Sequence, residues 1–270
     1  MASVVRELNH VAIRVADMDE SLRFYHELLG GEIIRDSKGP DGKSQFVYVQ
    51  LAEGVIELIK GQPGAANLGL QHIAYLTSKD HDIYSAADAV RAHGYEFTVE
   101  PKMASSGDGY LCFFKDKGGT TFELIQRDED IRIPGLKNEK ILEFDHISIR
   151  ADETSYADTQ ELLQGLLGMK VRRLFQKPGT AMEYYNYGPD TVEILFGKDK
   201  PKPDQPIIHI ALRVKCSKEM YKLLIANGFT ASEPKESGMG GFFITNATGP
   251  DGEIVEFLDR PSLDEYQPTK

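Results

Sequence analysis

The chain repeats one pattern four times, a histidine that opens an alternating apolar run and a glutamate that lies inside a later apolar run. The interval from histidine to glutamate is 47 residues in the first, third and fourth copies and 51 in the second. The four pairs are His10 with Glu57, His72 with Glu123, His146 with Glu193, and His209 with Glu256. Because self-similarity at a fixed period marks a repeat architecture, this register predicts four copies of one supersecondary unit.

Each copy predicts the same order of elements, a strand, then a helix, then three short strands. In the first copy, Asp17 or Asp19 can cap a helix whose apolar stripe runs from Leu22 to Leu29. Gly30 can end that helix in the left-handed conformation. The unit is therefore βαβββ, and we expect an α+β fold of four such units with mixed β-sheets.

The connections between copies predict how the units pair. The polar stretch at 127–140 is longer than the other connections and contains Pro134 and Gly135, so we interpret it as a linker. The expected organisation is a first module at 1–127 with units in 1–76 and 68–127, a linker at 128–140, a second module at 141–260, and a C-terminal tail at 261–270.

Charge and apolar content exclude several classes of partner. The net charge is −11, and basic residues do not cluster with aromatic ones, so we expect no nucleic-acid partner. No apolar run reaches the roughly 18 residues of a membrane span. The first residues lack the regions of a signal peptide, which predicts a cytoplasmic protein. Cys112 and Cys216 form no disulfide or zinc-thiolate pattern.

Side-chain parity places the repeated residues on one face of each strand. Successive side chains of a strand alternate, so His10 and Arg14 share a face while Val11 and Ile13 point to the opposite, helix-covered face. The same parity relates Arg150 to the third histidine and Arg213 to the fourth. These three arginines are either salt-bridge formers or anchors for a substrate carboxylate or phosphate.

A carboxylate inside an apolar strand is costly to bury unless its charge is compensated, and a metal ion compensates it well. Imidazole and carboxylate ligands suit zinc, nickel, cobalt, manganese or iron. We therefore predict a divalent metal ion as cofactor. All eight repeated side chains are candidate ligands: His10, Glu57, His72, Glu123, His146, Glu193, His209 and Glu256.

The sequence resembles the vicinal oxygen chelate superfamily, which includes glyoxalase I, methylmalonyl-CoA epimerase, extradiol dioxygenases, and fosfomycin and bleomycin resistance proteins. The resemblance is carried by the opening HVAIRVADMDESLRFYHELLG and by the closing hairpins FFKDKGGTTFELI and TGPDGEIVEFL. It implies two glyoxalase-like modules with cupped mixed sheets. It also implies that each module supplies a set of two histidines and two glutamates to a metal.

The resemblance further implies a lyase or isomerase of glyoxalase or epimerase type, acting on a small molecule that chelates the metal through vicinal oxygens. Glu123 or Glu256 would take and return the substrate proton. An Fe(II) extradiol dioxygenase is the alternative, since His146, His209 and Glu256 would satisfy its ligand set. A non-catalytic antibiotic-binding protein is a third hypothesis. A homodimer is compatible with the sequence.

Overall fold

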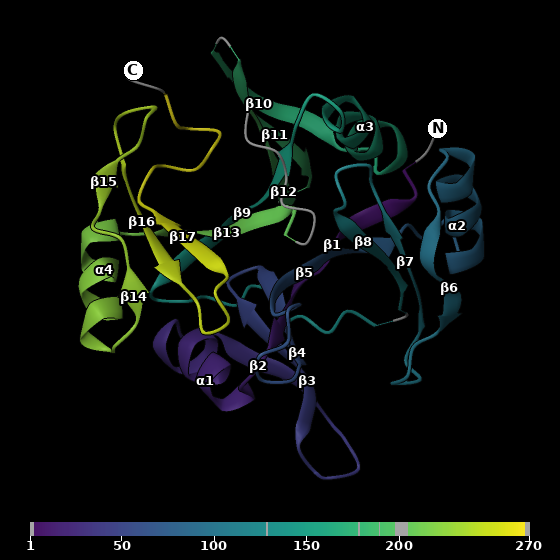
Figure 1. Cartoon of the computed structure of the whole chain (residues 1–270), viewed down its shortest axis with the longest axis horizontal. Helices are drawn as coiled ribbons and strands as arrows, with labels where there is room; N and C mark the ends of the chain where they lie inside the picture. Colours follow the sequence, from purple (N-terminus) through teal and green to yellow (C-terminus); the bar gives the residue numbers. More distant parts are fainter. Residues whose placement is uncertain (1–2, 128, 178, 189, 198–204, 268–270) are drawn as a thin grey trace. The chain divides into compact units, whose positions relative to one another are not determined.

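The computed structural model describes residues 3–127, 129–177, 179–188, 190–197 and 205–267. Residue 128 of the predicted linker and residues 268–270 of the predicted tail lie outside the described residues. Within the described ranges the chain forms two mixed sheets, and each sheet contains two copies of the repeat (Figure 1).

The first sheet has eight strands in the order β2-β3-β4-β1-β5-β8-β7-β6. The two copies therefore lie side by side and meet where β1 adjoins β5. Their elements are β1 (Val5–Val15), α1 (Met18–Leu22), η1 (Arg23–Leu28), β2 (Glu32–Lys38), β3 (Ser44–Leu51), β4 (Gly54–Lys60), β5 (Gly69–Thr77), α2 (Ile83–Ala92), β6 (Phe97–Met103), β7 (Tyr110–Lys115) and β8 (Thr121–Gln126).

The second sheet repeats this order as β10-β11-β12-β9-β13-β17-β16-β14, with β15 also pairing with β16. Its elements are β9 (Ile141–Ala151), α3 (Tyr156–Glu161), η2 (Leu162–Leu166), β10 (Lys170–Lys177), β11 (Thr180–Tyr187), β12 (Asp190–Phe196), β13 (Ile207–Val214), α4 (Ser217–Ala226), β14 (Thr230–Ala231), β15 (Lys235–Glu236), β16 (Phe243–Thr248) and β17 (Ile254–Leu258). The predicted α+β class and the fourfold βαβββ order are confirmed. In the last copy, two short strands, β14 and β15, replace one longer strand.

The helices of the first and third copies change pitch at the same place. The Asp17 side chain caps α1 by accepting hydrogen bonds from the backbone N–H groups of Asp19 and Glu20, as predicted. The helix then widens into the π-helical turn η1, where the Leu29 N–H donates to the Phe24 carbonyl at 3.0 Å. Gly30 follows with φ +75° and ends the helix as expected. The widened turn recurs as η2, and the sequence pattern did not predict it.

The chain divides into two compact units. The first unit comprises residues 1–12, 71–130 and 147–208, and the second comprises residues 13–70, 131–146 and 209–270. In the first unit, the turn before β8 contacts α3, where the Thr159 hydroxyl donates to the Asp116 carboxylate at 2.9 Å. In the second unit, the turn before β17 contacts the first helix, where the Tyr25 hydroxyl donates to Glu253 at 2.6 Å. The predicted module boundaries stay a prediction.

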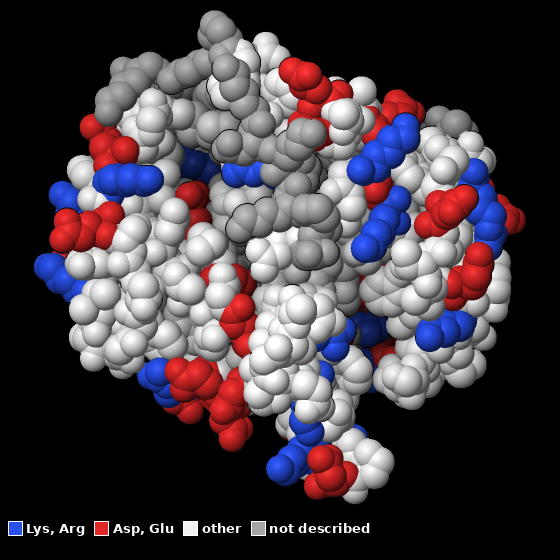
Figure 2. Space-filling model, in the orientation of Figure 1, with Lys and Arg blue, Asp and Glu red and all other residues white. Residues whose placement is uncertain are grey.

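Apolar side chains fill the interface between each sheet and its helices. Val11 and Ile13 of β1 are fully buried, as parity predicts, and so are Phe24 and Tyr25 of η1. The helix α2 packs on β7 and β8, and α4 packs on β16. Among the described helices, none has the length and apolarity to cross a lipid bilayer. On the face of the described residues shown in Figure 2, basic and acidic side chains are interspersed.

Candidate metal centres

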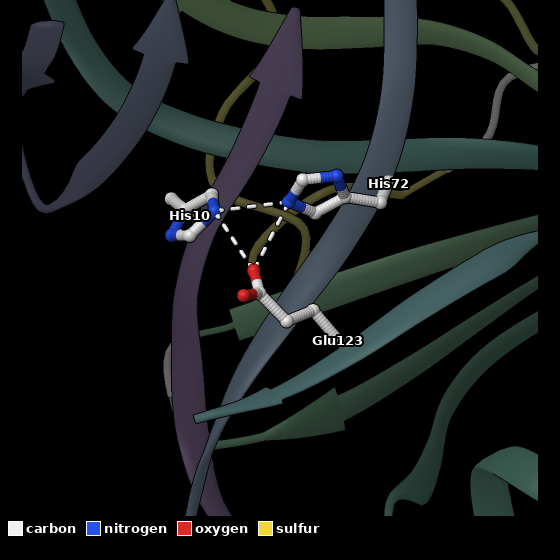
Figure 3. Close-up of side chains that lie close together, drawn as sticks. All are labelled: His10, His72 and Glu123. Atoms are coloured by element: carbon white, nitrogen blue, oxygen red, sulfur yellow. Dashed lines mark hydrogen bonds and ion pairs between the residues drawn. The ribbon is translucent and has the colours of Figure 1, made fainter. Parts of the chain in front are cut away.

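Three side chains from three neighbouring strands converge in the first sheet. His10 lies on β1, His72 on β5 and Glu123 on β8, and their ligand atoms all lie within 4.8 Å of one another (Figure 3). The two Nε2 atoms are 3.2 Å apart, and Glu123 Oε2 lies 3.4 Å from His10 Nε2 and 3.1 Å from His72 Nε2. All three side chains are buried.

Strand register explains this convergence. β5 and β8 pair in parallel with Ala74 beside Glu123. His72 precedes Ala74 by two residues, so it projects from the same face of the sheet as the glutamate.

The electrostatic environment keeps Glu123 ionised. Burial disfavours its charged form, but hydrogen bonds and the charges of His10 and His72 outweigh that effect and lower the pKa of Glu123 to about 2. A buried carboxylate of this kind is an effective cation ligand.

The second sheet repeats the centre with nearly the same geometry. His146 on β9, His209 on β13 and Glu256 on β17 form the second group of ligand atoms within 4.8 Å. The Nε2 atoms of the two histidines are again 3.2 Å apart. Their rings are 5.3 Å apart at 69°, compared with 5.3 Å and 68° in the first centre. Ala211 lies beside Glu256, as Ala74 lies beside the first glutamate.

Two of the eight predicted ligands belong to neither of the groups that the described residues form. Glu57 lies on β4 opposite Tyr48, and Glu193 lies on β12 opposite Tyr184. Both glutamates are buried, at 7% and 3% exposure. Glu193 also pairs with Ser148, which places it on the face that carries the third histidine. Their role as ligands stays a prediction.

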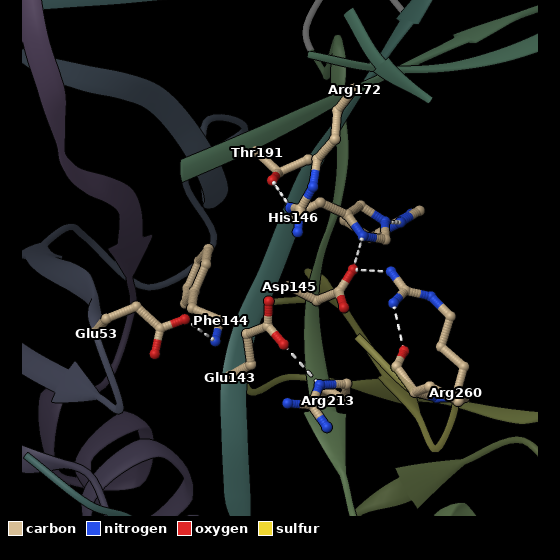
Figure 4. A network of polar contacts seen from close by, with 11 residues as sticks. Glu53, Glu143, Phe144, Asp145, His146, Arg172, Thr191, Arg213 and Arg260 are labelled. Atoms are coloured by element: carbon tan, nitrogen blue, oxygen red, sulfur yellow. Dashed lines mark hydrogen bonds and ion pairs between the residues drawn. The ribbon is translucent and has the colours of Figure 1, made fainter. Parts of the chain in front are cut away.

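The three predicted arginines differ in their surroundings. Arg213 Nε lies 2.6 Å from Glu143 Oε2 in a partly buried ion pair (Figure 4), so the salt-bridge alternative describes at least part of its role. Arg14 and Arg150 are half-buried on β1 and β9. A substrate-binding role for the three residues stays a prediction.

The first histidine of each centre is held by residues that the repeat pattern did not identify. His10 Nδ1 contacts Asn9 Oδ1 at 2.8 Å, and His146 Nδ1 contacts Asp145 Oδ1 at 2.7 Å (Figure 4). Arg260 also donates to Asp145 Oδ1. A signal was present, because Asn or Asp precedes the first and third histidines and an arginine follows the second and fourth glutamates by four residues.

This arrangement fits a divalent metal. When the ring of His10 or His146 is neutral, the acceptor oxygen at Nδ1 favours a proton on that nitrogen, so Nε2 presents its lone pair toward the neighbouring histidine and glutamate. The Nε2 atoms of two histidines and one carboxylate oxygen are ligands suited to zinc, nickel, cobalt, manganese or iron, and they leave further coordination positions for other oxygen ligands.

Residues 7–124 match the model of the glyoxalase/bleomycin resistance protein/dioxygenase superfamily. A putative lactoylglutathione lyase from Brassica oleracea is 29% identical over 206 residues, 68% of each chain. A probable lactoylglutathione lyase from Synechocystis is 33% identical over 126 residues, which are 44% of this chain and 94% of the relative.

Solved structures share the fold over nearly the whole chain. An Mn(II)-bound glyoxalase from Novosphingobium aromaticivorans aligns with a TM-score of 0.71 at 20% identity, covering 98% of this chain and 87% of that one. The 2,3-dioxygenase LapB from Pseudomonas aligns with a TM-score of 0.68 at 15% identity, covering 98% and 96%. At these identities the likeness concerns the fold alone.

Proposed function

The chain belongs to the glyoxalase/bleomycin resistance protein/dioxygenase superfamily, and on that basis we propose that it is a divalent-metal-dependent lyase or isomerase of glyoxalase type. Its substrate would be a small molecule with two neighbouring oxygens. The observation that carries this proposal is the pair of groups, the first buried and the second buried except for the partly exposed Glu256, each with two imidazoles and one carboxylate whose ligand atoms lie within 4.8 Å of one another. The names of the lactoylglutathione lyase relatives support the same reaction class.

Six residues would hold the metal: His10, His72 and Glu123 in the first centre, and His146, His209 and Glu256 in the second. When bound, a divalent ion supplies Lewis acidity that makes a C–H bond next to a carbonyl more acidic. The second glutamate of each set, Glu57 or Glu193, remains a candidate fourth ligand.

The chain itself provides the proton-transfer group. Glu123 or Glu256 would accept the proton from the substrate carbon and return it to the neighbouring carbon, so one C–H bond breaks, another forms, and no oxidant is consumed. Arg14, Arg150 or Arg213 would orient an anionic substrate group.

Deuterium incorporation tests the proposal directly. Lactoylglutathione and a panel of α-hydroxycarbonyl compounds are incubated with the metal-loaded protein in D₂O, and exchange at the carbon next to the carbonyl is followed by proton NMR. We expect exchange with loaded protein, loss of exchange after chelation, and recovery on reloading. Unchanged exchange after complete metal removal would contradict the proposal.

A second candidate function, an Fe(II) extradiol dioxygenase, is favoured by one observation. Each group among the described residues contains two histidines and one glutamate, and this three-ligand set is characteristic of non-haem iron oxygenases. Oxygen consumption with catechols and Fe(II) would support this candidate. Turnover under strict anaerobiosis would exclude it.

We also propose a cytoplasmic enzyme with no nucleic-acid or membrane partner. The net charge of −11 disfavours contact with a phosphate backbone, and the two cysteines are free. A homodimer is compatible with the proposal.

A further inference from the structure

The two centres share their three ligand types but differ in the group behind the first histidine. In the first centre, His10 Nδ1 donates to the side-chain amide oxygen of Asn9 at 2.8 Å. In the second, His146 Nδ1 donates to the carboxylate of Asp145 at 2.7 Å. Asn9 and Asp145 occupy the same position of the repeat and are both buried. One histidine therefore contacts a neutral acceptor and the other an anionic one.

The arginine that completes each arrangement also differs. Arg260 Nη2 donates to Asp145 Oδ1 at 2.6 Å, and both side chains are 1% exposed. In the first centre, Arg127 Nη1 lies 3.5 Å from Asn9 Oδ1, and Arg127 Nε lies 3.6 Å from Asp108. The longer contact still orients the Asn9 amide, because the arginine can only donate and so selects the oxygen as its neighbour.

The acceptor at Nδ1 affects the nitrogen on the opposite side of the ring. A carboxylate acceptor polarises the imidazole more strongly than an amide does, which raises the basicity of Nε2 as a metal ligand. The charge-assisted bond is also about twice as strong as a neutral one, so it restricts ring rotation more. Arg260 holds the carboxylate oxygen at this position.

We propose that Asn9 and Asp145 are positioning residues that make the two centres unequal, so that the second centre retains a divalent cation longer than the first. This inference rests on the proposed function, because it requires an ion in each centre. The difference in ion retention would then arise at one position of the repeat, where Asn9 offers an amide oxygen and Asp145 offers a carboxylate oxygen. Loss of such an outer contact typically changes metal affinity by about 10-fold to 100-fold.

Release kinetics test the inference on the full chain. The protein is loaded with Zn²⁺ and mixed with an excess of a chromogenic chelator, and ion release is followed by absorbance. We expect a fast and a slow phase of equal amplitude, with rates that differ by about 10-fold or more. The variants His10→Ala and His146→Ala assign the phases: the first should lose the fast phase and the second the slow one.

Reciprocal substitutions then test the cause. Asp145→Asn should accelerate the slow phase toward the fast one. That variant leaves the Arg260 charge buried beside an amide, so a loss could also reflect misfolding. Asn9→Asp is the reciprocal variant, and its carboxylate beside Arg127 should slow ion release in the fast phase by about 10-fold. Slower release from the first centre could not be caused by damage to the fold.

The outcomes separate the inference from the proposed function. A single release rate for both ions, or a fast phase that Asn9→Asp leaves unchanged, would overturn the inference and leave the proposed function intact. Protein that binds no Zn²⁺ would overturn both. A slower first phase in Asn9→Asp together with a faster second phase in Asp145→Asn would establish the asymmetry.

Discussion

At the scale of single residues, each centre is defined by which atoms the imidazole rings direct inward. His10 and His146 place Nδ1 on an oxygen of the preceding residue, so Nε2 faces the adjacent histidine and glutamate. In the first centre, the buried carboxylate of Glu123 lies within 3.4 Å of both Nε2 atoms. Replacing that carboxylate therefore removes both a ligand and the proposed proton acceptor.

We predict that Glu123→Gln and Glu256→Gln each reduce the turnover rate of the substituted centre by about 10²-fold to 10⁴-fold, which is the usual contribution of a positioned acid–base group. The fold should persist, since glutamine has the same shape. Steady-state kinetics and circular dichroism measure the two effects.

Glu183→Gln is the matched control for these variants. Glu183 is a buried strand glutamate that accepts hydrogen bonds from Tyr185 and Gln160 outside both centres. Its replacement should lower stability without lowering turnover per folded molecule. Full activity in the Glu123→Gln/Glu256→Gln double variant would show that neither glutamate transfers the proton.

At the scale of elements, the turns that precede the last strand of a copy hold buried acids against a helix. Asp116 accepts hydrogen bonds from the Thr159 hydroxyl of α3 and from the Thr120 N–H. Burial, only partly offset by these bonds, raises the pKa of Asp116 to about 6. The folded state therefore binds a proton at Asp116 more tightly than the unfolded chain does.

This shift gives a pH-dependent prediction for Asp116→Asn. Because the folded pKa lies above the ordinary value of about 4, the associated stability is fully present below pH 4 and is lost as the pH rises through 6. The ionised wild-type carboxylate should thus lower the free energy of unfolding by about 3 kcal/mol at pH 7.5. Asp116→Asn should be more stable than wild type at pH 7.5, and this advantage should disappear near pH 4.

Urea denaturation at the two pH values measures this difference. If the free energies of unfolding of variant and wild type differed by the same amount at pH 4 and at pH 7.5, Asp116 would not titrate in this range. Asp82→Asn is the control, because Asp82 caps α2 at an exposed position and its pKa is lowered by hydrogen bonds to Ser85. That substitution should not stabilise the protein at either pH.

At the scale of the whole molecule, the two centres fall into different compact units. His10, His72 and Glu123 all belong to the unit that contains residues 71–130, and His146, His209 and Glu256 all belong to the other. Each ion would therefore stabilise its own unit, and loss of one centre should leave the other able to bind.

Metal removal should lower the thermal unfolding midpoint. An ion present at 100 times its dissociation constant stabilises a folded site by about 2.7 kcal/mol. We expect chelator to lower the midpoint of the wild type and to have a smaller effect on His10→Ala, which retains one centre. Differential scanning calorimetry over a series of free Zn²⁺ concentrations measures the shift, and a midpoint independent of Zn²⁺ would contradict binding to the folded state.

The sequence predicted the fold because the repeat is regular at the level of side-chain parity. The recurring His–Glu interval predicted four βαβββ copies, and the alternation of side chains along β1 correctly predicted that Val11 and Ile13 are buried. The π-helical turns and the divided strand β14/β15 were not predictable in this way. Such features depend on how a helix or hairpin fits its neighbours in three dimensions, which periodicity does not record.

The candidate centres were predictable only in part for a related reason. Parity places Glu57 and Glu123 on the same face as the histidines, but it does not give the distance across neighbouring strands, which depends on strand order and sheet curvature. The structure groups Glu123 with both histidines of its sheet, and the ligand role of Glu57 stays a prediction. The sequence shows that Asn9 and Asp145 recur at the same position of the repeat. Only the structure shows that their side-chain oxygens contact Nδ1 of the following histidine.

The number of divalent ions bound per chain tests the central claim most directly. Purified wild type, His10→Ala, His146→Ala and the double variant are saturated with Zn²⁺, dialysed, and measured by elemental analysis against protein concentration. The two-centre account predicts two ions per chain in the wild type, one in each single variant and none in the double variant. A wild type without bound ions, or a double variant that still binds two, would contradict it.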